Sequence, residues 1–202
     1  MKIEEDENGT FIMNAKDLNL SSYIDEILES GVIDSLKIEG RTKSPYYVGI
    51  TTKVYREAID DFYEGKFDPE KYYKELLTTK HRGFSDGYLI HRPYEKLNTQ
   101  KLDSSISEGE KQVYALVDES GEYFFAKDKV EPDTIYEIVS PEKEIKICKN
   151  EIGEIFKENG NYFIKLNKIE TKNGKILTAV HSGNTNPVKL PCRLPPFTFF
   201  RK

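Results

Sequence analysis

The chain has few of the residues that build metal and redox sites. Its 202 residues include two cysteines, Cys148 and Cys192, and three histidines. The cysteines lie far apart, and no Cys or His pair has the short spacing that zinc or redox motifs require. The sequence therefore predicts no metal site. We expect both cysteines to be reduced, buried thiols, and a disulfide between them is the alternative.

Several other signals are absent as well. No segment approaches the roughly 20 apolar residues of a membrane span. The acidic start MKIEEDENG lacks the apolar region of a secretory signal. We therefore expect a cytoplasmic protein without a membrane partner. Glycine-rich phosphate loops of the GxGxxG or Walker type are missing. The formal net charge of −5 gives no overall positive field, so RNA binding would need a local patch.

The chain does have ample material for hydrophobic cores. Its 13 Tyr and 11 Phe supply apolar bulk although 32% of the residues are charged, and a disordered chain would lack such aromatics. The hydrophobic pattern changes along the chain and predicts an α+β protein in three parts. These parts are βα units in residues 1–80, a polar linker in 81–110 and a small all-β barrel in 111–202.

The first part shows a β-α-β-α order. Two short strands, 10–13 and 35–38, are each followed by charged residues and then by a helical pattern. The helices are expected at about 22–30, 44–64 and 68–79. Ser44 is the expected N-cap of the second helix, with Pro45 in its first turn.

Two parallel strands with their helices cannot bury a sheet by themselves, because a parallel sheet needs neighbours and both faces covered. We therefore expect residues 1–64 to close a larger unit whose earlier βα units precede Met1. The alternative is that these strands pair with the C-terminal part or with a second chain.

The second part changes to short alternating runs with turn signals between them. Asn159-Gly160 and Asn173-Gly174 are strong hairpin signals, and Ser120-Gly121 is a further turn signal. Many short strands of this spacing predict a small closed barrel. The expected strands are 113–117, 123–126, 135–139, 145–148, 152–156, 162–166, 176–180, 188–190 and 198–200.

Four charged residues follow the two N-terminal strands. Lys16 and Asp17 come after the first strand, and Glu39 and Arg41 come after the second. If the strands are adjacent and parallel, these side chains meet at one end of the sheet, where ligands collect. Lys and Arg can hold a carboxylate or phosphate, and a carboxylate can orient them or move a proton. A salt-bridge network without function is the alternative.

Further cations and aromatic rings lie nearby in sequence. Lys43, Tyr46, Tyr47 and Arg56 combine positive charge with stacking surfaces, a combination that suits single-stranded RNA. A solvated helix face explains Arg56 equally well. His81 and Arg82 are RNA-contact candidates in a loop, or serve structure instead. Residues 111–202 carry a formal charge of +2 and the first 110 residues −7, which favours RNA docking by the second part only weakly.

The stretch from residue 13 to residue 47 resembles the U32 family, historically called U32 peptidases or collagenase-like proteases. The segments MNAKDL (13–18) and KIEGR (37–41) carry the resemblance, and it continues through VYREAID (54–60) and HRGFSDG (81–87). It covers the first half of the chain strongly. For the fold it implies the closing βα units of a TIM-like barrel followed by a small β-barrel.

The resemblance also implies a function, prephenate-dependent 5-hydroxylation of the wobble uridine of tRNA. In that interpretation Glu39 and Asp17 are catalytic. Arg56, His81 and Arg82 contact RNA, the β-barrel assists RNA binding, and this piece alone is inactive. The prephenate-binding residues are Asn14, Lys16, Arg41, Lys43, Tyr46 and Tyr47. The alternatives are a collagenase-type protease, for which no nucleophile is visible, and a non-catalytic RNA- or protein-binding module.

Cofactor binding is the one point at which the chain departs from the family pattern. Several members hold an iron–sulfur cluster, and many have Cys where this chain has Asn19. An amide cannot replace a thiolate ligand at equal affinity. The segment therefore predicts no cofactor of its own, and any cluster would be held by cysteines upstream. The sequence does not define the oligomeric state.

Overall fold

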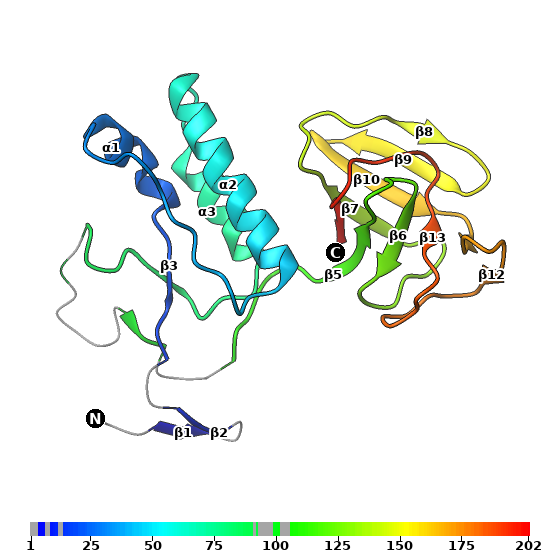
Figure 1. The fold of residues 1–202 in the computed structure, drawn as a ribbon, viewed down its shortest axis with the longest axis horizontal. Helices are drawn as coiled ribbons and strands as arrows, with labels where there is room; N and C mark the ends of the chain where they lie inside the picture. The colour runs from blue at the N-terminus through cyan, green and yellow to red at the C-terminus, as the bar shows by residue number, and fades with distance from the viewer. Residues whose placement is uncertain (1–3, 7–8, 12–13, 91, 93–98, 102–105) are drawn as a thin grey trace. The chain divides into compact units, whose positions relative to one another are not determined.

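The structure, a computed structural model, describes residues 4–6, 9–11, 14–90, 92, 99–101 and 106–202. The chain divides into two units, unit 1 with residues 1–110 and unit 2 with residues 111–202. The fold is mixed, as predicted. The helices lie in unit 1, and a large curled antiparallel sheet forms unit 2 (Figure 1).

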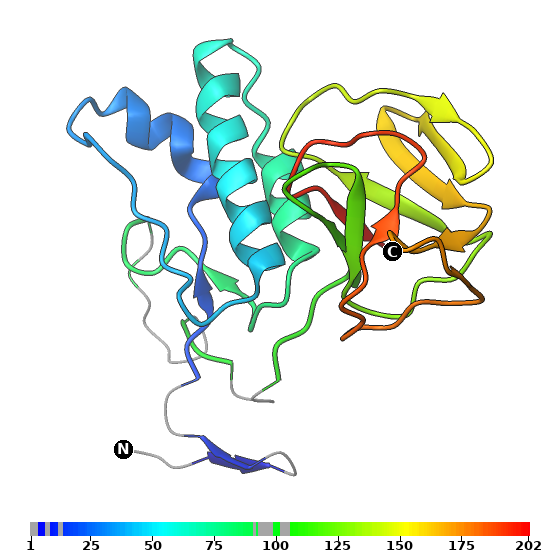
Figure 2. The ribbon, with the colours of Figure 1, turned by 45° about the vertical axis from the view of Figure 1, so that its right-hand side comes forward.

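The helices of unit 1 follow the sequence prediction closely. A short 3-10 turn, η1 (Ser21–Tyr23), leads into α1 (Ile24–Glu29), followed by α2 (Pro45–Tyr63) and α3 (Pro69–Leu77). Helices α2 and α3 pack side by side (Figures 1 and 2), and Asp61 of α2 accepts hydrogen bonds from Lys71 and Tyr72 of α3. No helix in the described part of the chain combines the length and the apolar character of a membrane span.

The caps of these helices are only partly those expected. Ser44 caps α2 by accepting the N–H of Tyr47 at 3.2 Å, and Asp68 caps α3. Gly31 adopts the left-handed conformation after α1, with φ of 64°. No side-chain hydrogen bond caps α1, whose N-cap residue is Tyr23.

The strands of unit 1 differ from the prediction. Strands β1 (Glu4–Asp6) and β2 (Gly9–Phe11) form an antiparallel hairpin, and the rest of the predicted strand 10–13 lies outside the described residues. The predicted strand 35–38 is absent, and residues 31–39 are exposed without regular structure. The parallel pair is instead β3 (Asp17–Leu18) with β4 (Phe84–Ser85). The predicted β-α-β-α order is therefore wrong in its strand pairing.

Residues 81–110, predicted as a linker, belong to unit 1 where they are described. Besides β4, they contribute antiparallel bridges between Ala15 and Gln100 and between His81 and Glu108. The N–H of His81 donates to the carbonyl of Glu108 at 2.8 Å. These contacts hold the segment against β3 and the end of α3.

Unit 2 is one eight-stranded antiparallel sheet with a side hairpin. In spatial order the sheet contains β13, β6, β5, β14, β7, β10, β9 and β8. The strands are β5 (Val113–Val117), β6 (Tyr123–Ala126), β7 (Ile135–Val139), β8 (Cys148–Lys149), β9 (Gly153–Glu158), β10 (Asn161–Leu166), β13 (Val188–Lys189) and β14 (Phe199–Arg201). The hairpin consists of β11 (Ile169–Glu170) and β12 (Ile176–Leu177). One apolar cluster, which includes Phe124, Ile155, Ile164 and Phe200, fills the curled sheet.

The sheet of unit 2 curls but does not close through strand pairing. In the described chain β13 and β8 are its two edges, so the predicted closed barrel is a half-barrel. A disulfide joins Cys148 of β8 to Cys192, three residues beyond β13, and Asn150 donates a hydrogen bond to the carbonyl of Pro191. The expectation of two reduced thiols is thus corrected. Side chains, rather than a ladder of backbone hydrogen bonds, connect the two edges.

Candidate functional site

The candidate site of unit 1 is built where β3 and β4 run side by side. The N–H of Asp17 donates to the carbonyl of Gly83 and that of Asn19 to the carbonyl of Ser85, both at 2.9 Å. Side chains alternate along a strand, so Asp17 and Asn19 share a face. Burial agrees with this alternation, because Asp17 and Asn19 are each 8% exposed while Leu18 between them is 62% exposed.

Asp17 organises the first half of the site. Its carboxylate accepts a hydrogen bond from Lys43 Nζ at 2.7 Å and one from the backbone N–H of Arg82 at 3.1 Å. The guanidinium of Arg82 reaches Asn14 Oδ1 at 3.4 Å. We call Asn14, Asp17, Lys43, Tyr47 and Arg82 the Asp17 cluster. It combines two cations with one buried carboxylate, which is an arrangement that can hold an anionic ligand.

Helix α2 supplies the aromatic side of the Asp17 cluster. Its N-cap Ser44 fixes the chain just after Lys43, and the Lys43 ammonium lies 4.5 Å from the centre of the Tyr47 ring. Burial, and next the negative charge of Asp17, raise the pKa of Tyr47 to about 12. Tyr47 is therefore neutral at physiological pH and acts as a hydrogen-bonding or stacking group rather than as a base.

His81 lies at the edge of the Asp17 cluster. Its Nδ1 accepts the N–H of Gly83 at 2.9 Å, and its ring stacks on Phe84 with 4.1 Å between centroids. Burial lowers the pKa of His81, mainly because the charged imidazolium loses hydration, and Lys43 and Lys101 act in the same direction. The aliphatic part of Lys16 passes close to Gly83.

The structure does not bring the other predicted residues into this cluster. Glu39 is exposed and pairs with Lys37 at 3.4 Å, and Arg41 is exposed. Within the described residues no ion pair or hydrogen bond joins either of them to Asp17. The predicted cluster of Lys16, Asp17, Glu39 and Arg41 therefore does not form. The strand 35–38, which was expected to place Glu39 and Arg41 beside Asp17, is absent.

Two further candidate residues, Tyr46 and Arg56, make contacts within the helical part of unit 1. The Tyr46 side chain is buried, and its hydroxyl lies 3.1 Å from Thr78 Oγ1 at the end of α3. Arg56 forms an ion pair with Asp60 one turn along α2. Both contacts agree with a structural role, and the functional roles assigned to these residues from the sequence stay predictions.

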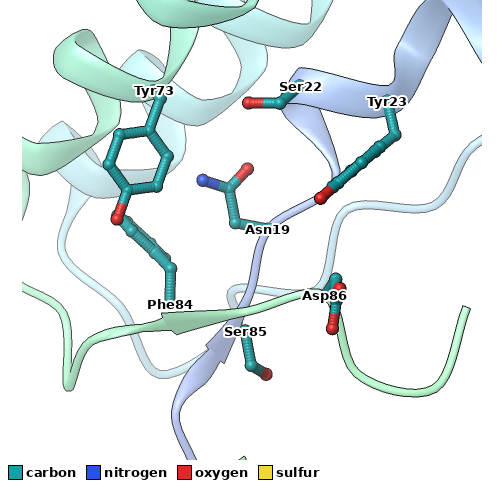
Figure 3. A pocket seen from close by; sticks show the side chains of 7 residues that line it. All are labelled: Asn19, Ser22, Tyr23, Tyr73, Phe84, Ser85 and Asp86. Atoms are coloured by element: carbon teal, nitrogen blue, oxygen red, sulfur yellow. The ribbon is translucent and has the colours of Figure 1, made fainter. Parts of the chain in front are cut away.

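A pocket of about 300 Å³ forms the second half of the site, and no sequence pattern predicted it. We call it the Asn19 pocket; it is lined by Asn19, Ser22, Tyr23, Tyr73, Phe84, Ser85 and Asp86 (Figure 3). Tyr73 of α3 meets Phe84 of β4 edge to face, with ring centroids 5.8 Å apart. Asn19 Oδ1 accepts the N–H of Ser21 at 2.9 Å and the Tyr55 hydroxyl at 3.4 Å. The sequence singled out Asn19 only as the position where the family resemblance implies a Cys in many members.

The residues present do not fit an iron–sulfur cluster. Asn19, where the resemblance implies a Cys in many members, uses its amide oxygen in these two hydrogen bonds. The two cysteines of the chain both lie in unit 2 and are bonded to each other. Among the described residues no group of three or more His, Cys, Asp or Glu side chains is placed to hold a metal ion. The described segment thus offers no thiolate ligand.

Comparison with known proteins identifies a protein family and several relatives. Residues 1–99 match the family model of peptidase family U32. The tRNA hydroxylation protein P of Helicobacter pylori strain ATCC 700392 / 26695 is 48% identical over 200 residues, which is 98% of this chain and 47% of that protein. The protein of the same name from Escherichia coli K12 is 41% identical over 104 residues, 52% of this chain and 23% of that protein.

A protein named for a different activity also matches. A collagenase of Porphyromonas gingivalis is 36% identical over 91 residues, 44% of this chain and 25% of that protein. No solved structure gives a significant match. The chain spans about half the length of the Helicobacter relatives that it matches.

Proposed function

Because this chain belongs to peptidase family U32, we propose that it acts in tRNA modification, in the prephenate-dependent 5-hydroxylation of the wobble uridine. The observation that carries the proposal is the extent of the similarity. Identity of 48% to tRNA hydroxylation protein P spans 98% of the chain and therefore includes both units. The collagenase similarity spans 44% of the chain.

The Asp17 cluster supports an anionic small-molecule substrate. Prephenate carries two carboxylates, and the cluster contains two cations, the Lys43 ammonium bonded to Asp17 and the Arg82 guanidinium bonded to Asn14. Arg can bind a carboxylate through two parallel hydrogen bonds, and Lys acts as a point charge. In this proposal Asp17 holds the Lys43 ammonium and the backbone of Arg82 in place, Asn14 holds the Arg82 guanidinium, and Lys16 and Tyr47 line the same region. Glu39 and Arg41 would join only after residues 31–41 rearrange.

RNA contact by His81, Arg82, Arg56 and unit 2 belongs to the same proposal. Unit 2 carries the less acidic half of the chain, at a formal +2. On its sheet Phe156 and Phe163 stack with centroids 5.7 Å apart and remain partly exposed. Partly exposed aromatic rings beside lysines are the surfaces on which unpaired bases stack.

Exposed apolar side chains in unit 1 support a TIM-like barrel completed by further βα units. Val32 is 76% exposed, and Ile33, Leu36 and Ile38 are exposed on the same run, as is Leu18 of β3. An uncovered apolar run of this kind marks a surface that a partner element buries. In a longer chain with those units, amides 35–38 would form a strand and exchange slowly with deuterium. Fast exchange of these amides in such a chain would contradict this part of the proposal.

The proposed function also has consequences for cofactor binding and for the cellular location. The described segment contributes no cofactor ligand, so any iron–sulfur cluster of the protein would be held by residues outside it. We place the protein in the cytoplasm, where a tRNA substrate is available.

The proposal is tested in a strain that lacks the native gene. Complementation with the gene should restore 5-hydroxylated wobble uridine, measured by mass spectrometry of digested tRNA. Lys43→Met should lower this product about tenfold or more, because the anion loses a charged partner. Lys66→Met is the matched control, since the Lys66 side chain is 70% exposed and pairs with Glu64, away from the Asp17 cluster. Unmodified tRNA after complementation would refute the proposal, and gelatin cleavage by the purified protein would favour the protease alternative.

A further inference from the structure

We propose that the Asn19 pocket receives one unpaired uracil base. This inference rests on the proposed function for the identity of the base and deepens it by naming where the base is held. The pocket lies on the same face of β3 as Asp17, two residues farther along. Two residues span about 7 Å of a strand, so a ligand in the pocket lies next to the cations of the Asp17 cluster.

The walls of the pocket suit a flat ring. Tyr23, Tyr73 and Phe84 present three aromatic side chains, and Tyr73 and Phe84 are fixed by their edge-to-face contact (Figure 3). The volume of about 300 Å³ lies at the small end of ligand sites and leaves room for one base and part of its ribose. Aromatic walls of this kind bind flipped-out bases by stacking.

The amide of Asn19 supplies a directed polar contact. Its oxygen already accepts two hydrogen bonds, from Ser21 N–H and the Tyr55 hydroxyl, and this fixes the Nδ2 group on the other side of the amide. Within the described residues Nδ2 makes no hydrogen bond, and it points into the pocket (Figure 3). The Asn19 side chain is 8% exposed, and an acceptor on a ligand in the pocket would give its Nδ2 group a hydrogen-bond partner.

A carbonyl oxygen is the group that satisfies this donor. Uracil presents two carbonyl acceptors on its pairing edge, cytosine presents one, and adenine offers ring nitrogens instead. Asp86 is also among the lining residues and brings a carboxylate to the pocket. The Asn19 donor can therefore pair with either carbonyl of uracil, and the proposed function selects uracil among the bases.

The test measures binding of a short RNA hairpin to the 202-residue chain. The loop contains one unpaired uridine, and matched hairpins carry adenosine or an abasic site there. Fluorescence anisotropy gives the affinities at a fixed salt concentration, because RNA binding depends steeply on salt. We expect the uridine hairpin to bind about tenfold more tightly than either matched hairpin.

Asn19→Asp is the sharpest variant. The carboxylate keeps both acceptor positions for Ser21 and Tyr55 but removes the donor that faces the pocket. It should abolish the preference for uridine while the melting temperature changes little. Tyr73→Ala removes a wall and should weaken binding about 5- to 150-fold. Tyr63→Ala is the control, because Tyr63 is an exposed tyrosine of α2 outside the pocket, and it should leave binding unchanged.

A second measurement reports the place of binding directly. Nitration of tyrosines should be slowed at Tyr23 and Tyr73, but not at Tyr63, by the uridine hairpin or by high concentrations of uridine. If all hairpins bind with the same affinity and neither pocket variant changes it, the pocket proposal is overturned while the tRNA role remains. Failure of every hairpin to bind and of uridine to protect Tyr73 would overturn the pocket, while the complementation experiment decides the tRNA role separately.

Discussion

Two carboxylates that the sequence placed together have opposite environments. Asp17 is 8% exposed and holds Lys43 and the Arg82 backbone, whereas Glu39 is exposed and pairs with an exposed lysine. Removing one partner of a buried pair leaves the other group unsatisfied, whereas exposed pairs contribute little. Their contributions to the free energy of unfolding should therefore differ severalfold.

The prediction is that Asp17→Ala lowers the free energy of unfolding by about 2–3 kcal/mol, because the buried side of Lys43 and the Arg82 N–H lose their acceptor. Glu39→Ala should change it by less than about 0.5 kcal/mol. Urea denaturation followed by circular dichroism of the α2 and α3 helices measures both. Equal effects of the two substitutions would contradict the burial that the structure assigns to Asp17.

His81 gives a prediction about pH. Burial lowers its pKa below the ordinary 6.5, so between the folded pKa and 6.5 the unfolded chain binds more protons than the folded chain. The stability that His81 contributes is fully present above pH 6.5 and is lost as pH falls from 6.5 through the folded pKa. Urea titrations from pH 5 to 8 should show this loss. Asn at this position removes the titration and retains an acceptor for Gly83, so His81→Asn should flatten the pH dependence of stability.

At the residue scale, sequence patterns found Asp17, Lys43 and Arg82 but not how they meet. Asp17 and Arg82 are 65 residues apart and are joined by a two-residue parallel pairing, which is too short to give a periodic signal. Asn19 was noticed only as a missing cysteine. Its role depends on Tyr55 and Ser21 fixing the amide, which is a three-dimensional arrangement that no local pattern encodes.

At the scale of elements, the helices were predictable because their caps are local. Ser44 and Asp68 each precede a proline and each accepts backbone N–H bonds from the first turn. Ser44→Ala should lower the free energy of unfolding by about 1 kcal/mol, whereas Ser44→Gly should cost only a few tenths. Chemical denaturation of both variants checks this order. A loss as large for glycine as for alanine would show that Ser44 matters through some contact other than the cap.

The strand predicted at 35–38 shows where element prediction fails. Leu36 and Ile38 alternate with polar residues, which is the pattern of a half-buried strand, yet both are exposed here. A strand needs a neighbouring strand to satisfy its backbone groups, and within the described residues this run has none. The pattern thus indicates a strand that has no partner strand among the described residues. This agrees with the proposed larger barrel, in which another strand would pair with it.

At the scale of the whole molecule, most strands and turns of unit 2 were predictable, but β11 was missed and the way the sheet edges are joined was not predicted. Asn159 and Gly160 both have positive φ, as a tight hairpin turn requires, and they connect β9 to β10. The order of strands depends on β14, the last strand of the chain, which inserts between β5 and β7. Such long-range pairings leave no mark on the local sequence.

The disulfide between Cys148 and Cys192 connects the two edges of that sheet and closes a loop with a sequence separation of 44 residues. Loop closure of this length restricts the unfolded chain and should stabilise unit 2 by about 3–4 kcal/mol. A strong reductant should therefore lower the unfolding midpoint of unit 2, and Cys192→Ser should reproduce the shift. The reductant should have no further effect on that variant.

An unchanged midpoint in reductant would show that Asn150 and the apolar core join the edges without the disulfide. Such a result would also suit the proposed cytoplasmic location, because glutathione there keeps most thiols reduced. A large shift would instead mean that the stability of the curled sheet depends on the redox state of its surroundings. The half-barrel would then be fully stable only where the Cys148–Cys192 bond can form.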